Sequence, residues 1–142
     1  MGKSKPIILI DPYPRTMDLL FSEENLNYLK KNFKLITAPH KNKNNFYEKN
    51  LPNADYIFGQ PNLPSSLISK STKLKAIFNV ESNFMDNMDY DYCFRNGIHV
   101  LATSPVFAQP VAEMAIGLTL SIARSIHIAH SDFILKKEKY GG

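Results

Sequence analysis

Cysteine is almost absent from this chain of 142 residues, and the single Cys93 cannot form an internal disulfide. No cluster of cysteine and histidine has zinc-finger spacing. Long apolar runs are missing as well. Residues 7–10 are too few for the apolar region of a secretory signal, and residues 111–123 are fewer than the ~20 that cross a bilayer. These absences predict a reduced, cytoplasmic protein with no metal centre and no membrane span.

A large excess of charge of either sign is also lacking. Lys and Arg number 17 against 13 Asp and Glu, which gives a net charge of +4 and a sequence pI of about 9.1. The lysines are scattered among asparagines and acidic residues, and no motif of aromatic and basic residues accompanies them. This pattern is more typical of solvated lysine faces than of a phosphate-binding patch, so we expect no nucleic-acid partner.

Five short apolar segments alternate with stretches of helical character. The first contains a continuous run, Ile-Ile-Leu-Ile at residues 7–10, typical of a strand covered on both faces of a parallel sheet. The predicted strands are residues 5–10, 34–38, 54–59, 74–80 and 98–101. The predicted helices begin after Ser22 or occupy residues 64–69 and 89–96, and residues 42–50 form either a short helix or a loop. This alternation predicts an α/β fold, a flavodoxin-like open parallel sheet of about five strands.

The C-terminal part follows a different pattern. Ser104 and Pro105 predict a turn, and Pro110 fits the first turn of a long helix over residues 111–130. Apolar residues nearly encircle the middle of this helix, so a single sheet could not cover them all. We therefore expect a second partner for the helix, either another domain or another subunit. The basic tail has no closing element, and we expect the natural protein to continue beyond it.

The second half of the chain contains a series of motifs in a fixed order. They are Asp86-Asn87-Met88-Asp89, Arg95-Asn96-Gly97-Ile98-His99-Val100, Thr103, Val111-Ala112-Glu113 and Ala123-Arg124. With this order and spacing, residues 79–124 resemble the D-isomer-specific 2-hydroxyacid dehydrogenases, the family of phosphoglycerate, formate and D-lactate dehydrogenases. The resemblance implies a substrate-binding domain over residues 1–101. It also implies a hinge and the first long helix of a Rossmann-type nucleotide-binding domain over residues 102–142.

The resemblance also implies a function and a set of site residues. The complete enzyme would transfer a hydride between NAD or NADP and C2 of a 2-hydroxy or 2-oxo acid. In the family, the loop that matches Ser82, Asn83 and Phe84 offers backbone N–H groups to the substrate carboxylate. The hinge touches the nicotinamide end of the cofactor, so the resemblance makes Thr103 and Ala108 the residues that contact it.

The remaining machinery of the family does not occur in this sequence. No Gly-x-Gly-x-x-Gly turn is present to hold a pyrophosphate, and the family's catalytic Arg, Glu and His come after the long helix. The resemblance therefore implies the front part of such an enzyme, which binds the acid and dimerises through the helix over residues 111–123. Two alternatives stay open: a non-catalytic binding or dimerisation module on the same scaffold, and an inactive truncated fragment.

Several single residues have a structural interpretation beside a functional one. Tyr13 and Gln60 follow strands at the predicted carboxyl edge of the sheet, where open α/β folds bind ligands, and are either cleft residues or ordinary loop residues. Cys93 is expected in the core, because no motif supplies it with a base. His127 and His130 have no third ligand nearby in the sequence, so we expect helix-end charges rather than a metal site.

Overall fold

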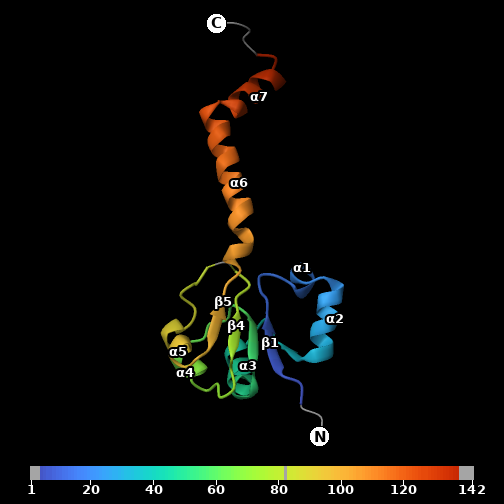
Figure 1. The fold of residues 1–142 in the computed structure, drawn as a ribbon, viewed down its shortest axis with the longest axis vertical. Helices are drawn as coiled ribbons and strands as arrows, with labels where there is room; N and C mark the ends of the chain where they lie inside the picture. The colour runs from blue at the N-terminus through green and yellow to red at the C-terminus, as the bar shows by residue number, and fades with distance from the viewer. Residues whose placement is uncertain (1–3, 82, 138–142) are drawn as a thin grey trace. The chain divides into compact units, whose positions relative to one another are not determined.

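The structure is a computed structural model that describes residues 4–81 and 83–137. The chain forms two compact units, Met1–Ser104 and Pro105–Gly142. The first contains a parallel sheet with the strand order β2-β1-β3-β4-β5. Figure 1 shows this sheet with β1, β4 and β5 labelled. The strands are β1 (Ile7–Asp11), β2 (Lys34–Thr37), β3 (Tyr56–Gly59), β4 (Ala76–Phe78) and β5 (His99–Leu101). The predicted α/β class and the parallel sheet are confirmed.

Helices connect successive strands of this sheet. They are α1 (Met17–Leu20), α2 (Glu23–Asn32), α3 (Lys43–Asn50), the 3-10 helix η1 (Leu51–Asn53), α4 (Ser65–Ile68) and α5 (Tyr90–Arg95). α2 begins after Ser22, whose hydroxyl accepts a hydrogen bond from the Asn25 N–H at 3.3 Å, as expected for a helix cap. The segment left open as helix or loop is the helix α3. The sequence pattern missed α1 and η1, because elements this short show no periodicity.

The core lies on one face of the sheet. Leu9, Ile57 and Ile77, from three neighbouring strands, are fully buried and pack with apolar residues of α3, α4 and α5. Cys93 of α5 is fully buried in the same cluster, and burial raises the pKa of its thiol to about 11. The expected core position of Cys93 is therefore confirmed, and its thiolate is disfavoured.

The opposite face of the sheet is only partly covered. Phe21 and Phe33, at the two ends of α2, line a groove of about 400 Å³ together with Leu29 and apolar residues of the sheet. The sheet contributes Ile8, Ile10, Tyr56, Phe58 and Phe78. Phe78 is still 39% exposed, so the residues that the structure describes leave apolar surface over β4 in contact with solvent.

Two helices follow the sheet, α6 (Ser104–Ala123) and α7 (Ile126–Ile134). The prediction of one helix over residues 111–130 is wrong at both ends. α6 begins earlier because Pro105, like Pro110, suits a first helical turn, and Pro110 lies inside the helix. Ser125 has a left-handed φ of 51°, and this backbone conformation separates α6 from α7.

The length of α6 also bears on the expectation of no membrane span. The helix has 20 residues, most of them apolar, and none of them is buried. By length and composition alone it could cross a membrane, which residues 111–123 did not indicate because the helix begins before them. Both properties are weak indications, since core helices of soluble proteins share them. The apolar surface of α6 needs a cover, and a protein partner provides one as well as lipid does.

Candidate functional site

The loop after β4 is held by one side chain from the end of β3. Gln60 follows directly on β3, and its side-chain amide bonds to the loop at two points. Nε2 donates to the carbonyl oxygen of Asn83 at 2.9 Å, and Oε1 accepts from the N–H of Glu81 at 3.2 Å. A single planar amide therefore fixes the loop on both sides of residue 82.

Gly59 determines where Gln60 leaves the sheet. Its φ is 148°, and a Cβ at this position would lie 2.1 Å from the carbonyl oxygen of Asp11 on the neighbouring strand β1. Any side chain would collide with that backbone, and the φ value itself favours glycine. The close approach of β1 and β3 at Gly59 thus fixes the backbone position from which the Gln60 side chain extends.

The three predicted carboxylate-binding residues belong to the held loop. Ser82 lies outside the residues that the structure describes. Asn83 and Phe84 are exposed, and within the described chain neither of their backbone N–H groups has an acceptor. Phe84 does not have a positive φ, so its side chain causes no backbone strain there. Two N–H donors are therefore available to a ligand.

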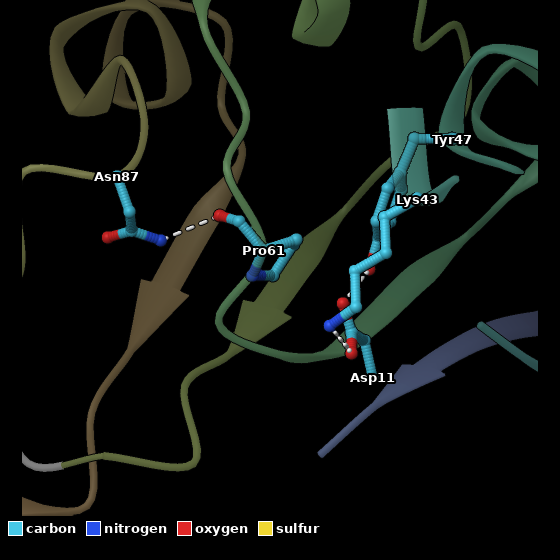
Figure 2. A network of polar contacts seen from close by, with 5 residues as sticks. All are labelled: Asp11, Lys43, Tyr47, Pro61 and Asn87. Atoms are coloured by element: carbon cyan, nitrogen blue, oxygen red, sulfur yellow. Dashed lines mark hydrogen bonds and ion pairs between the residues drawn. The ribbon is translucent and has the colours of Figure 1, made fainter. Parts of the chain in front are cut away.

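The far end of this loop is fixed to the segment that follows Gln60. Asn87 Nδ2 donates to the carbonyl oxygen of Pro61 at 2.7 Å (Figure 2). The Leu63 N–H donates to the Asn87 carbonyl oxygen at 2.7 Å, and the Asp89 N–H donates to the Leu63 carbonyl oxygen at 3.2 Å. Asn87 and Asp89 of the family motif thus fix the shape of the loop.

Asp89 also anchors α5. Its Oδ1 accepts a hydrogen bond from the Tyr92 N–H at 2.8 Å, and its Oδ2 accepts one from the Ser65 hydroxyl. The bond from Ser65, followed by the one from Tyr92, holds the pKa of Asp89 below its ordinary value. The carboxylate is therefore charged at neutral pH and joins the first turns of α4 and α5.

A second polar cluster surrounds Asp11, the last residue of β1 (Figure 2). The Asp11 carboxylate is 5% exposed. Lys43 Nζ lies 2.6 Å from Oδ1, and the Tyr47 hydroxyl donates to Oδ2 at 3.1 Å. Burial, and next the charge of Asp11, raise the pKa of Tyr47 far above its usual range, so this hydroxyl stays protonated. Both oxygens of a buried carboxylate are thus satisfied, as a stable buried charge requires.

A cavity of about 240 Å³ lies beside this cluster. Its lining includes Asp11, Tyr13, Arg15, His40 and Lys43. The Lys43 ammonium lies 5.5 Å from the centroid of the Tyr13 ring, a cation–π distance. Arg15 Nε lies 3.4 Å from Glu81 Oε1 and so links the loop after β1 to the loop after β4. Of the two candidate cleft residues, Tyr13 therefore lines a cavity and Gln60 holds a loop.

The two predicted cofactor-contacting residues lie on different elements. Thr103 follows β5, and its buried hydroxyl has no hydrogen-bond partner in the part of the chain that the structure describes. The amide of Asn79, which follows β4 and is 2% exposed, also lacks one there. Ala108 is an exposed residue of α6. Buried polar groups normally have partners, so the unpaired Thr103 hydroxyl is an exception among the described residues.

Sequence reasoning missed Lys43 and Tyr47, although a signal existed. The two residues are four apart on a segment considered as a helix, so they share one helical face. An aspartate at the end of a buried strand needs such partners. The contacts of Gln60 had no comparable signal, because 21 and 23 residues separate it from the positions it bonds.

Metal-binding groups are not apparent in the described residues. No cluster of three or more His, Cys, Asp and Glu side chains among them could hold a metal ion. His127 and His130 are exposed residues of α7.

An open parallel sheet with an anchored loop at its carboxyl edge is the architecture of an α/β ligand-binding domain. The family model of the D-isomer specific 2-hydroxyacid dehydrogenase catalytic domain matches residues 15–136. This chain belongs to that family, and the resemblance seen in its motifs is confirmed.

Solved structures share this fold. A phosphoglycerate oxidoreductase from Rhizobium etli is 38% identical with a TM-score of 0.81, and the match covers 98% of this chain and 43% of that chain. An NADPH-dependent glyoxylate/hydroxypyruvate reductase from Sinorhizobium meliloti, in complex with citrate, is 22% identical with a TM-score of 0.67, covering 94% and 39%. D-lactate dehydrogenase from Aquifex aeolicus, complexed with NAD and lactic acid, is 19% identical with a TM-score of 0.58, covering 96% and 39%. The chain thus spans less than half of these proteins. No curated protein matches it.

Proposed function

We propose that this chain is the substrate-binding part of an NAD(P)-dependent D-2-hydroxyacid dehydrogenase. The whole enzyme interconverts a 2-hydroxy acid and a 2-oxo acid. The observation that carries the proposal is the anchored loop with available N–H groups at Asn83 and Phe84, in a chain of this family. NAD, NADPH and lactic acid are named for the solved relatives, which supports the cofactor and the substrate class.

The loop over residues 82–84 binds the carboxylate of the acid. Backbone N–H groups are suited to this task because they present fixed dipoles and lose no side-chain entropy on binding. Phe84 packs edge-on against Tyr90, with 5.1 Å between ring centroids, and gives the loop an apolar support. The N–H groups of Ser82, Asn83 and Phe84 are the proposed donors.

The cofactor is held only in part by this chain. Thr103 and Ala108 are the contacts with the nicotinamide end in this proposal, as the family resemblance implies. Gly59, Gly97 and Gly117 are isolated, so the sequence has no turn that fits the pyrophosphate. When bound, NAD or NADP would supply the hydride chemistry. Residues 1–101 hold the acid, and the catalytic side chains come from outside this sequence.

The helix over residues 111–123 is the proposed dimer contact. Its exposed apolar side chains include Val111, Met114, Ile116, Leu118, Leu120 and Ile122. A continuous apolar surface of this kind is rare on a soluble monomer and marks an interaction site. A second copy of the chain is the proposed partner, and the cytoplasm is the proposed location.

The experiment uses the full-length protein in which this chain occurs. Oxidation of NADH or NADPH is measured with glyoxylate, hydroxypyruvate and pyruvate. Phe84→Pro removes one backbone donor and should lower kcat/KM by about 10²-fold, as loss of one oxyanion donor does. Phe84→Ala keeps the N–H and is the matched control, with a much smaller loss expected. A stable dimer that reduces none of these acids and binds neither cofactor would overturn the proposal in favour of a non-catalytic module.

A further inference from the structure

We propose that Gln60 is a positioning residue that sets which groups of the loop meet the substrate carboxylate. The inference rests on the proposed function, in which that loop binds the acid. It goes beyond it because Gln60 donates nothing to the substrate. The residue acts through two hydrogen bonds to the loop backbone.

The Gln60 side-chain amide bonds to the loop as a peptide group of a neighbouring β-strand would. A Gln amide carries an N–H donor and a carbonyl acceptor in one plane, as a peptide unit does. Here the donor meets the carbonyl oxygen of Asn83, and the acceptor meets the N–H of Glu81. The N–H of Glu81 and the carbonyl oxygen of Asn83 are thus tied to a single rigid group. A planar amide supplies both bonds with its donor and acceptor on separate atoms.

The two bonds determine which N–H and carbonyl groups of the loop remain available to a ligand. The N–H of Glu81 is used by Gln60 and is not a donor for a ligand. The carbonyl oxygen of Asn83 accepts a hydrogen bond from Gln60, and this N–H donor offsets the partial negative charge of the oxygen. The N–H groups of Asn83 and Phe84 keep no acceptor among the described residues. An incoming carboxylate therefore meets positive dipole ends with little opposing charge from this carbonyl.

The remaining anchors of the loop do not depend on Gln60. The bonds of Asn87 to Pro61 and Leu63 fix the far end, and the Arg15–Glu81 ion pair lies at the exposed near end. Gln60 itself is half-buried at the rim of the sheet and outside the core cluster. Its replacement should therefore loosen Glu81 and Asn83 while the domain stays folded.

The test compares Gln60→Met and Gln60→Glu with the wild type in the full-length protein. Methionine keeps the length of the side chain and removes both hydrogen bonds. Glutamate keeps the acceptor for the Glu81 N–H, loses the donor to Asn83 and adds a negative charge near the loop. The matched control is Asn32→Leu, which deletes another amide-to-carbonyl bond, from Asn32 Nδ2 to the Tyr28 carbonyl oxygen at the end of α2.

Binding of oxamate, a carboxylate analogue of a 2-oxo acid, is measured together with KM for glyoxylate and for the cofactor. We expect Gln60→Met to raise the oxamate Kd and the glyoxylate KM about tenfold, since small displacements of binding groups carry losses of this order. Gln60→Glu should raise both further, and the cofactor KM should not change. Amide hydrogen exchange at Glu81 should become faster in Gln60→Met. The control should leave all four quantities unchanged.

The outcomes separate this inference from the proposed function. If the wild type reduces 2-oxo acids and Gln60→Met leaves both the oxamate Kd and the glyoxylate KM unchanged, the role of Gln60 is refuted and the function stands. If the wild type reduces no 2-oxo acid but Gln60→Met still weakens oxamate binding, the role of Gln60 stands and hydride transfer is refuted. A wild type that neither binds oxamate nor reduces a 2-oxo acid overturns both. A lower thermal stability with unchanged oxamate binding assigns Gln60 a merely structural role.

Discussion

The sheet unit and the two C-terminal helices place their apolar side chains in opposite ways. In the sheet unit, Leu9, Ile57 and Ile77 are completely buried. In α6 and α7 no residue is buried, although α6 is long and apolar. Burial of apolar side chains therefore stabilises the sheet unit by itself, whereas the described residues provide no such burial for α6 and α7. The difference teaches that the proposed site lies on a self-supporting core, while the proposed dimer contact lies on helices without one.

The largest effect that sharpens this comparison is expected in the sheet core. Ile77→Ala should lower the free energy of unfolding by about 2–5 kcal/mol, because it leaves a cavity in a fully buried cluster. The matched control is Leu118→Ala in α6, a residue that is 57% exposed. The control should change the unfolding free energy of the sheet unit by less than ~0.5 kcal/mol. Urea unfolding followed by circular dichroism measures both, and equal losses at the two positions would contradict the division.

The next effect concerns association through α6. Ile116→Glu places a charge on the apolar surface and should weaken the proposed dimer by about 2 kcal/mol, or roughly 30-fold in Kd. Sedimentation equilibrium of the full-length protein measures the change. The control is Phe94→Glu on α5, which is similarly exposed at 57% but lies in the sheet unit. A dimer that is weakened only by the control substitution would assign the interface to the sheet unit.

An effect of similar size is expected at the Asp11 cluster. Tyr47→Phe removes the hydrogen bond to Asp11 Oδ2 and should destabilise the sheet unit by about 1.5–3 kcal/mol, the range for a hydrogen bond to a charged group. Tyr28→Phe, on the exposed surface of α2, is the control and should have almost no effect. Thermal unfolding distinguishes the two. If both variants melt like the wild type, the cluster adds nothing to the stability of the sheet unit.

The smallest effect is a pH dependence at Asp89. Its pKa is lower in the folded state than the ordinary 3.8, so its contribution to stability is present above pH 3.8 and is lost as the pH falls through the folded-state pKa. Asp89→Asn should therefore be less stable than the wild type at pH 7, and the difference should shrink below pH 3.8. Urea unfolding at pH 7 and pH 3 measures it. A difference that is constant across this range would show that the charge of Asp89 does not matter.

The sheet was predictable because its signals are local. The apolar run at residues 7–10 is followed by prolines, and Gly59 and Gly97 end a strand and a helix. Ser22 caps α2 through its own side chain. The start of α6 was not predictable in the same way, because Pro105 and Pro110 are equally good first-turn residues. Ser125 carries no sequence signal for a left-handed backbone.

The candidate site was predictable only in its outline. The family motif located the loop at residues 82–84, and the carboxyl edge of the sheet drew attention to Gln60 and Tyr13. The bonds from Gln60 to Glu81 and Asn83 join segments that only the folded sheet brings together. No local pattern encodes such contacts, so which loop atoms are engaged and which remain available could be learned only from the structure.

The near-contact of Gly59 with the Asp11 backbone gives one position an influence on both polar clusters. The Asp11 carboxylate forms an ion pair with Lys43 and accepts a hydrogen bond from Tyr47, and Gln60 follows Gly59 directly. A methyl group at residue 59 would push β1 and β3 apart and would displace the anchors of two separate networks together. In a survey of tolerated variation, residue 59 should therefore be the point where stability and ligand recognition fail at once, while the partly exposed neighbour Phe58 accepts other apolar residues.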